Sequence, residues 1–329
     1  MTPRVLFPLL FAAVAGLFML SLLIGPAGFG VGESLNALIS GRGEAVTLVM
    51  REIRLPRAIL AVMVGVSLGL SGAALQGYLR NPLAEPGLIG VSGSAALGAV
   101  IALQTGFAAG FALALPLAAL VGALIAVFMI LLLAGPRGGS LTLILAGIAI
   151  SALAGALTSL ALNLSPNPFA VSETVFWMLG SLADRSFTHV WIALPLMLAG
   201  WALLAGIGRG LDALTLGEDA AAALGIRLDR LRLQLVVGVA ASVGAATAVA
   251  GAIGFVGLVV PHLLRPLVGA RPGLLLPASA LGGAAMVLLA DIAVRLILPD
   301  RDLKLGVVMA IVGAPLFLHL IYKTRRALP

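Results

Sequence analysis

The sequence predicts an all-α polytopic membrane protein, and three observations support this fold class. First, hydrophobic residues make up 61% of the 329 residues and charged residues only 10%, whereas about a quarter of a soluble domain is charged. Second, the apolar residues form long runs, and about 20 helical residues cross a hydrocarbon layer of roughly 30 Å. Third, these runs are continuous and do not alternate with polar residues, which argues against a membrane barrel.

Eight apolar runs are long enough to cross a membrane as helices. They cover residues 5–24, 58–79, 111–134, 141–163, 190–207, 233–260, 274–298 and 305–322. Two shorter stretches, 88–103 and 258–268, could form short or tilted spans, so hydropathy predicts eight to ten helices in one transmembrane domain over 1–329. The first run follows a basic residue, as in a signal peptide. It is long for one and lacks an A-x-A cleavage site, so we expect the first span there.

The distribution of basic residues predicts the orientation of the chain, because short loops rich in Lys and Arg stay on the cytoplasmic side. Two such segments are the C-terminal tail and the stretch 208–232. Their basic residues are Lys323, Arg325, Arg326, Arg209, Arg227, Arg230 and Arg232. Both segments are therefore predicted to be cytoplasmic, and an even number of spans places the N-terminus there too. The basic residues are scattered at helix ends, so we expect no binding of nucleic acid.

Several arginines disobey this rule, because they fall in loops predicted to be periplasmic. They are Arg42, Arg51, Arg54 and Arg57 in the loop 25–57, and Arg295 and Arg301 before the last span. One interpretation is anchoring at lipid headgroups, with Glu44 and Glu52 neutralising the loop. Another is docking of an acidic partner, because arginine forms bidentate pairs with carboxylates. Pro56 suits a first helical turn and would hold its neighbouring arginines at the mouth of the second span.

Ionisable residues are almost absent from the predicted spans. Asp291 is the only acid well inside an apolar run, and Arg295 lies four residues later on the same helical face, which predicts a helix-end ion pair. A carrier driven by protons or sodium usually has ionisable groups at mid-bilayer. The chain also lacks the phosphate loop G-x-x-x-x-G-K-[ST] and any cysteine. We therefore expect no metal and no cofactor on this chain, and energy from another subunit.

Small residues recur at helical spacing in two of the runs. The two stripes are Gly65, Gly69, Ala73 and Gly77, and Gly238, Ser242, Ala246, Ala250 and Gly254. Such stripes let helices approach closely in lipid. Chance is the alternative, because the chain contains 41 glycines.

The polar stretch 208–232 contains "GEDAAAALG", which predicts a short helix. Glu218 and Asp219 fall in its first turn, where acids suit the helix dipole, and Gly225 falls where a helix-ending glycine belongs. Ala221 and Leu224 would share one apolar face. The helix could lie on the membrane or insert into a cytoplasmic partner.

The stretch "QGYLRNPLAEPGLIGVSG" (76–93) interrupts the apolar pattern after the second run. Two prolines end the helix there, because the residue before proline avoids the α region. Gly87 and Gly90 permit re-entry into a short third span. Non-helical backbone at that depth is tolerated only where protein or a water-filled path covers it. We therefore expect 80–92 to be buried near the cytoplasmic side, with an ordinary interhelical loop as the alternative.

The stretches "RLPRAILAVMVGVSLGLSGAALQGYLRNPLAEPGLIGVSGSAALG", "GFVGLVVPHLLRPLVG", "LLPASALGGAAMVLLADIAVR" and "LKLGVVMAIVGAPLFLHLI" resemble the vitamin B12 and iron-siderophore ABC importer permeases, the FecCD/BtuC-type family. The resemblance covers nearly the whole chain. It implies a type II importer permease fold with ten helices in the cell inner membrane, both termini cytoplasmic. It also implies a homodimer around one path, two ATPase subunits that use ATP and Mg, and a periplasmic binding protein.

The resemblance also implies roles for particular residues. Arg54, Arg57 and Arg295 match arginines that pair with glutamates of the binding protein. The coupling helices correspond to 212–230, and the expected ATPase contacts are Leu216, Gly217, Glu218, Asp219, Ala221, Leu224 and Gly225. The gate corresponds to Ser140 and Leu141, where the family more often has two polar residues, and Asn81 and Pro82 are further path candidates. "WMLGSL" (177–182) resembles a short helix beside the path.

These features together predict the membrane-spanning subunit of an ATP-driven importer for an iron chelate (siderophore or haem) or cobalamin. Such a subunit is not an enzyme, because its partner hydrolyses ATP. The rival interpretations are an ATP-independent channel or secondary carrier, and a membrane scaffold that transports nothing.

Overall fold

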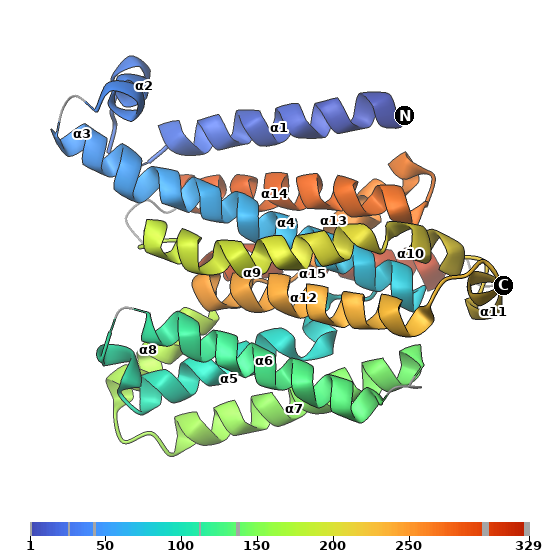
Figure 1. The fold of residues 1–329 in the computed structure, drawn as a ribbon. Coiled ribbons are helices and arrows are strands. Elements are labelled where there is room, and N and C mark those ends of the chain that lie inside the picture. The colour runs from blue at the N-terminus through green and yellow to red at the C-terminus, as the bar shows by residue number, and fades with distance from the viewer. Residues whose placement is uncertain are drawn as a thin grey trace.

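The structure is a computed structural model that describes residues 2–25, 27–41, 44–111, 113–135, 139–297 and 303–325. Within these ranges it contains helices and no strands (Figure 1). Seven of the described helices are long and apolar enough to cross a membrane, and three shorter apolar helices accompany them. The all-α membrane class is confirmed. Outside the description lie Arg42, Arg301 and Arg326, and the side chains of Glu44, Ser140, Lys323 and Arg325.

The long helices run along a common direction and form one bundle (Figure 1). They are α1 (Pro3–Leu23), α4 (Leu55–Leu79), α6 (Ala114–Ala134), α7 (Ser140–Asn163), α9 (Phe187–Gly206), α12 (Leu228–Ala250), α14 (Pro272–Ile297) and α15 (Leu305–Arg325). Two shorter helices, α5 (Val91–Gln104) and α13 (Val256–Leu264), begin at fully buried residues. Two helix breaks, one before α5 and one before α13, therefore lie inside the protein.

The two ends of the bundle carry different short helices. The first turn of α1, α10 (Gly208–Leu214) and α11 (Glu218–Ala223) lie together at one end, on the right in Figure 1. The opposite end carries α2 (Val31–Ser40), α3 (Glu44–Leu48) and α8 (Pro168–Met178). We call these the α11 end and the α2 end.

The predicted span 233–260 is wrong as a single helix. The chain leaves the helix after Ala250 and re-enters one at Val256, and both Gly251 (φ 71°) and Phe255 (φ 67°) have positive φ. A Cβ atom on Gly251 would lie 2.3 Å from the carbonyl oxygen of Trp177, so only glycine fits. The sequence stays apolar through this break, and hydropathy therefore gives no sign of it.

Pro56 lies in the first turn of α4, as expected, but the second span begins earlier than predicted. Its helix begins at α3, continues through the π-helical segment η1 (Val49–Arg54) and runs on as α4. The N–H group of Leu55 donates to the carbonyl of Met50, five residues back. This wider turn precedes the proline, which has no N–H group of its own to donate.

The stripes of small residues are packing surfaces, as predicted. Cβ atoms added to Gly65 and Gly69 of α4 would lie 2.3 and 2.0 Å from carbonyl oxygens of Gly283 and Ser279 on α14. In the second stripe, Gly238 and Ser242 of α12 pack against Gly200 of α9. The prediction is wrong for the last member of this stripe, Gly254, which lies beyond the end of α12 and is exposed.

The short helix expected at 177–182 is displaced. It is α8, which begins after Asn167, whose side chain accepts a hydrogen bond from the N–H of Phe169, and ends at Met178. Gly180 has φ 73°, so the chain turns there instead of continuing the helix.

Candidate coupling, docking and path sites

The polar stretch at the α11 end folds into two short helices. The predicted helix is confirmed as α11, with Glu218 and Asp219 in its first turn and Gly225 (φ 83°) directly after its C-cap. Gly217, which precedes α11, has φ 105°, a conformation that L side chains rarely adopt. Glycines therefore set both turns of this segment.

The expected common face of Ala221 and Leu224 is wrong. Ala221 is fully buried against the bundle, whereas Leu224 is 65% exposed and Leu216 is 69% exposed. Leu224 caps the end of α11 and no longer follows its periodicity. Two apolar side chains consequently project from the α11 end, as a surface that contacts a partner would present them.

Asp212 fastens this segment to the bundle. Its Oδ2 accepts from Arg271 Nε at 2.7 Å, and its Oδ1 accepts from the N–H of Gly273 at 2.6 Å. Gly273 lies in the first turn of α14, where free N–H groups and the helix dipole favour a carboxylate. The sequence analysis missed this contact, because the two partners are 61 residues apart.

At the α2 end, one buried carboxylate holds two arginines. Arg57 Nε donates to Oδ1 and Oδ2 of Asp291 at 2.9 and 3.1 Å, and its Nη2 lies 2.8 Å from Oδ1. The predicted pair of Asp291 and Arg295 is confirmed, with Nη2 and Oδ2 2.9 Å apart. Asp291 is fully buried, so the ion pairs satisfy a charge that would otherwise be costly.

The remaining donors of these arginines bind backbone carbonyls. Arg295 donates to the carbonyls of Ser21 and Ile24, and Arg54 donates to those of Leu22, Leu23 and Ala27. These acceptors lie at the end of α1 and just after it, so the arginines bind the end of the first span to α4 and α14.

The structure thus brings Arg54, Arg57 and Arg295 to one end of the bundle. Arg54 is 4% exposed, and the Arg57 and Arg295 side chains are 17% and 7% exposed. All three already have partners within the chain. Their docking role stays a prediction, and Arg57 has the most accessible side chain of the three.

The re-entrant segment 80–92 divides into an exposed and a buried half. Arg80, Asn81 and Pro82 are exposed, which corrects the expectation of full burial. The later residues from Ala84 to Val91 include five that are buried, namely Ala84, Pro86, Ile89, Gly90 and Val91. The segment therefore descends from the α11 end into the protein, where α5 begins.

Three polar side chains that the sequence analysis missed hold this segment in place. Gln76 Nε2 donates to the carbonyls of Ala84, Gly257 and Leu258, each at 3.3 Å. Arg265 Nη2 donates to Gln76 Oε1 at 2.7 Å, and Glu85 Oε1 accepts from the N–H of Phe255 at 2.7 Å. The two helix breaks therefore meet and hydrogen-bond to each other. The sequence did offer one sign of this contact: Gln76 is a polar residue inside an apolar run, and a buried polar side chain must find hydrogen-bond partners.

The gate candidates lie at the start of α7. Leu141 is exposed there, and the Ser140 side chain lies outside the description, so their role stays a prediction. Further along α7, small residues form an exposed face: Ala152, Gly155, Ala156 and Ser159. Such a face permits close approach of another helix.

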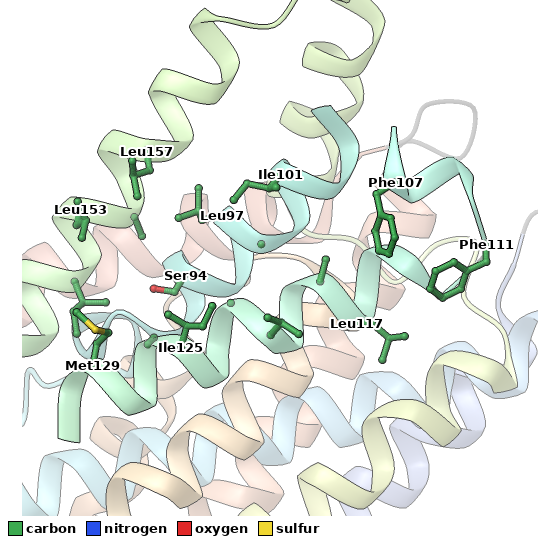
Figure 2. Close-up of a pocket in the computed structure, with 17 residues that line it drawn as sticks. Ser94, Leu97, Ile101, Phe107, Phe111, Leu117, Ile125, Met129, Leu153 and Leu157 are labelled. Atoms are coloured by element: carbon green, nitrogen blue, oxygen red, sulfur yellow. The ribbon is translucent and has the colours of Figure 1, made fainter. Parts of the chain in front are cut away.

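A groove of about 610 Å³ lies between α5, α6 and α7 (Figure 2). Its lining includes Leu97, Ile125 and Leu153, and Ser94 is the one residue with a polar side chain among those that line it. No cluster of metal-ligating side chains occurs among the described residues. The groove suits apolar chains and offers almost nothing to a polar ligand.

Comparison with known sequences identifies the relatives of this chain. The sequence model of the FecCD transport family matches residues 12–323. The chain belongs to the FecCD transport family. It is 39% identical over 299 residues to the ABC transporter permease protein YvrB of Bacillus subtilis (strain 168), covering 89% of this chain and 84% of YvrB. The vitamin B12 import system permease protein BtuC of Vibrio cholerae is 38% identical over 299 residues, covering 89% and 88% of the two chains.

Two further comparisons agree with this family membership. The cobalamin import system permease protein BtuC of Halobacterium salinarum is 38% identical over 283 residues, covering 85% of this chain and 75% of that protein. A solved structure described as an inward-facing conformation of a metal-chelate type ABC transporter superposes with a TM-score of 0.86 at 33% identity. The superposition covers 98% of this chain and 100% of the chain in the solved structure. The FecCD family chain is therefore a multi-pass permease subunit of an ABC importer, with the type II fold.

Proposed function

We propose that this permease carries cobalamin or a comparable metal chelate, such as a ferric siderophore or haem, across the cell inner membrane at the expense of ATP hydrolysed by a partner. The observation that carries the proposal is the α11 end. There, exposed Leu216 and Leu224 project from a segment that Asp212 fastens to α14. The cobalamin permeases among the relatives support that substrate class.

Two ATPase subunits would bind the two copies of this permease, one at each α11 end. ATP and Mg²⁺ belong to these subunits, because the permease lacks a phosphate loop. The contacts would include Leu216, Gly217, Glu218, Asp219, Leu224 and Gly225, whereas buried Ala221 would support the helix from inside. The α11 end would then face the cytoplasm, as its arginines suggest.

A periplasmic binding protein would dock at the α2 end. Arg57 is the most accessible of the three predicted docking arginines, with a side chain that is 17% exposed, and it would accept a second carboxylate from the binding protein. A second copy of the permease would pack along the small-residue face of α7 and enclose the path. That path would discriminate little between substrates, since the described α7 face carries no charge.

The test replaces both projecting leucines, as Leu216→Asp with Leu224→Asp, and purifies the permease from native membranes in mild detergent. We expect a stoichiometric amount of the ATPase subunit to co-purify with the wild type, and at least ten-fold less of it to co-purify with the double variant. Leu164→Asp is the matched control, because Leu164 is 70% exposed at the opposite end of the bundle. Retention of the ATPase by the double variant would refute the coupling site.

Substrate is tested by reconstituting the complex in liposomes with its binding protein. We expect ATP-dependent uptake of one chelate among cobalamin, haem and ferric siderophores. Flux of a chelate through the isolated permease without ATP would contradict the importer and support a channel.

A further inference from the structure

A polar pocket lies at the α11 end, between the end of α9, the start of α10 and the start of α12. It has a volume of about 270 Å³. Arg209, Arg227 and Arg230 form its exposed rim, and Ile207 and Leu231 are buried beneath them. We call it the arginine pocket. Arg209 comes from α10, and Arg227 and Arg230 come from the start of α12, so two separate segments bring their positive charges to one pocket.

The charge of the arginine pocket has no internal partner. None of its three arginines forms an ion pair or a side-chain hydrogen bond among the described residues, whereas Arg57, Arg271 and Arg295 are all paired. No acidic residue lines the pocket. The acid closest in sequence, Asp229, is 3.7 Å from Arg232 instead. The pocket therefore concentrates positive charge that an external anion can neutralise.

The depth of the arginine pocket matches the headgroup layer of a bilayer. Helix α9 has 20 residues and rises roughly 30 Å, about the thickness of the hydrocarbon core. The pocket begins at Gly206, the last residue of that helix. Its arginines consequently lie where lipid phosphates lie.

An apolar strip on the same two helices leads to the pocket. Leu198, Ala202 and Ala205 are exposed along α9 at spacings of four and three residues, and Leu233 is exposed on α12 one turn after Arg230. This surface faces acyl chains in a membrane, and the short alanine side chains let a hydrocarbon chain lie close to the helix. A ligand that fits both parts has a phosphate and two hydrocarbon chains.

We propose that the arginine pocket binds the phosphate of an anionic phospholipid whose acyl chains lie along this strip. Arginine binds phosphate oxygens through paired N–H donors, and basic pockets at the cytoplasmic surface suit such headgroups. Arg227 is the N-cap of α12, two residues after the turn at Gly225, so the bound lipid stabilises the connection between α11 and α12. The strip argues for lipid phosphate over a soluble anion, and the headgroup depth argues for lipid over a protein partner.

The experiment measures lipid binding to the full-length permease by native mass spectrometry. Phosphatidylglycerol and phosphatidylcholine with the same acyl chains are titrated separately. We expect at least a ten-fold preference for phosphatidylglycerol in wild type, and loss of that preference in the triple variant Arg209→Gln, Arg227→Gln, Arg230→Gln. Arg4→Gln with Arg80→Gln is the control, since both are exposed arginines at the same end, and it should keep the preference.

Four further results test the proposal and the source of the anion. A photoactivatable phosphatidylglycerol should label Ala202, Ala205 or Leu233 in wild type, a result that requires no variant to fold. Displacement of the lipid by millimolar inorganic phosphate would overturn the proposal in favour of a soluble anion. An unchanged lipid preference in the triple variant, with loss of the ATPase subunit, would overturn it in favour of a protein contact. A triple Arg→Lys variant should retain part of the preference, because the charge remains.

Discussion

At the scale of single residues, the glycines at the crossing of α4 and α14 determine how closely these helices approach. Carbonyl oxygens occupy the space that a side chain would need, 2.3 Å or less from the Cβ positions of Gly65, Gly69 and Gly283. The neighbouring atoms are backbone atoms and cannot rotate away. These positions therefore tolerate no side chain without separating two central helices.

We predict that Gly69→Ala destabilises the permease by about 1–3 kcal/mol or more, because overpacking of a tight core has this cost. Its Cβ atom would lie 2.0 Å from Ser279 O. Thermal unfolding in detergent measures the change. Gly16→Ala in α1 is the control, since nothing lies within 4 Å of its Cβ position, and a loss of equal size there would refute the steric explanation.

A second prediction concerns the buried carboxylate at the α2 end. Asp291→Asn removes the only acid that Arg57 and Arg295 contact within the described part of the chain, and we expect a loss of about 3–5 kcal/mol, typical of breaking a buried ion pair. Asp229→Asn removes a carboxylate that is 84% exposed and 3.7 Å from Arg232, and it should cost only about 0–1 kcal/mol. Chemical denaturation of both variants tests the difference, and equal effects would contradict it.

The sequence predicted part of this residue-scale detail. The pair of Asp291 and Arg295 follows from a spacing of four on a helix. The bond from Arg57 to the same carboxylate joins residues 234 positions apart, and no local pattern encodes it. For the same reason the sequence placed Arg54 outward, whereas the carbonyls at the end of α1 hold it inside.

At the scale of elements, the two broken helices meet inside the bundle. Prolines and glycines marked the break before α5, so the sequence predicted it. The break before α13 has an apolar sequence and was missed. It depends on Gly251 approaching Trp177 and on Glu85 accepting from Phe255, which are contacts between distant segments. Glycine alone does not mark a break in this chain, because glycines such as Gly65 and Gly69 lie inside a helix, whereas the prolines before α5 do mark one.

The contact between α10 and α14 gives a third prediction. Asp212→Ala removes both the ion pair with Arg271 and the acceptor for the N–H of Gly273. We expect the ATPase subunit to remain bound, while transport per ATP hydrolysed falls several-fold, because α10 no longer moves with α14. Measuring ATP hydrolysis and substrate uptake in the same liposomes gives the ratio of molecules transported to ATP hydrolysed.

Two variants make this prediction specific. Asp229→Ala removes an exposed acid from the same polar stretch and should leave the ratio unchanged. Arg271→Ala combined with Asp212→Ala should lower the ratio no further than Asp212→Ala alone, as expected for residues that act through one contact. An additive loss would count against the contact.

At the scale of the whole molecule, α14 connects the two ends. Its first turn contacts Asp212 and its last turns carry Asp291 and Arg295, and its 26 residues rise roughly 39 Å. Composition and hydropathy predicted the class and most spans. They could not predict which helix joins the two ends, because that depends on packing between helices.

The fourth prediction concerns assembly at this scale. The chain has no cysteine, so Ala152→Cys and Ala156→Cys each introduce a single thiol on the exposed small face of α7. We expect oxidation to link two copies through at least one of these positions, because small faces favour close helix contact in lipid. Leu198→Cys, on the exposed strip of α9, should stay monomeric on a denaturing gel. Linking through Leu198 alone would place the dimer contact elsewhere.

The distance along the chain between Arg57 and Asp291 also has a consequence for synthesis. Translation at about 5–20 residues per second separates these two residues by roughly ten to fifty seconds, given the 234 positions between them. During that interval the nascent chain inserts its early spans with Arg57 lacking its carboxylate. The arginine must stay at the lipid headgroups until Asp291 has been synthesised, and the α2 end becomes complete only after α14 has been made.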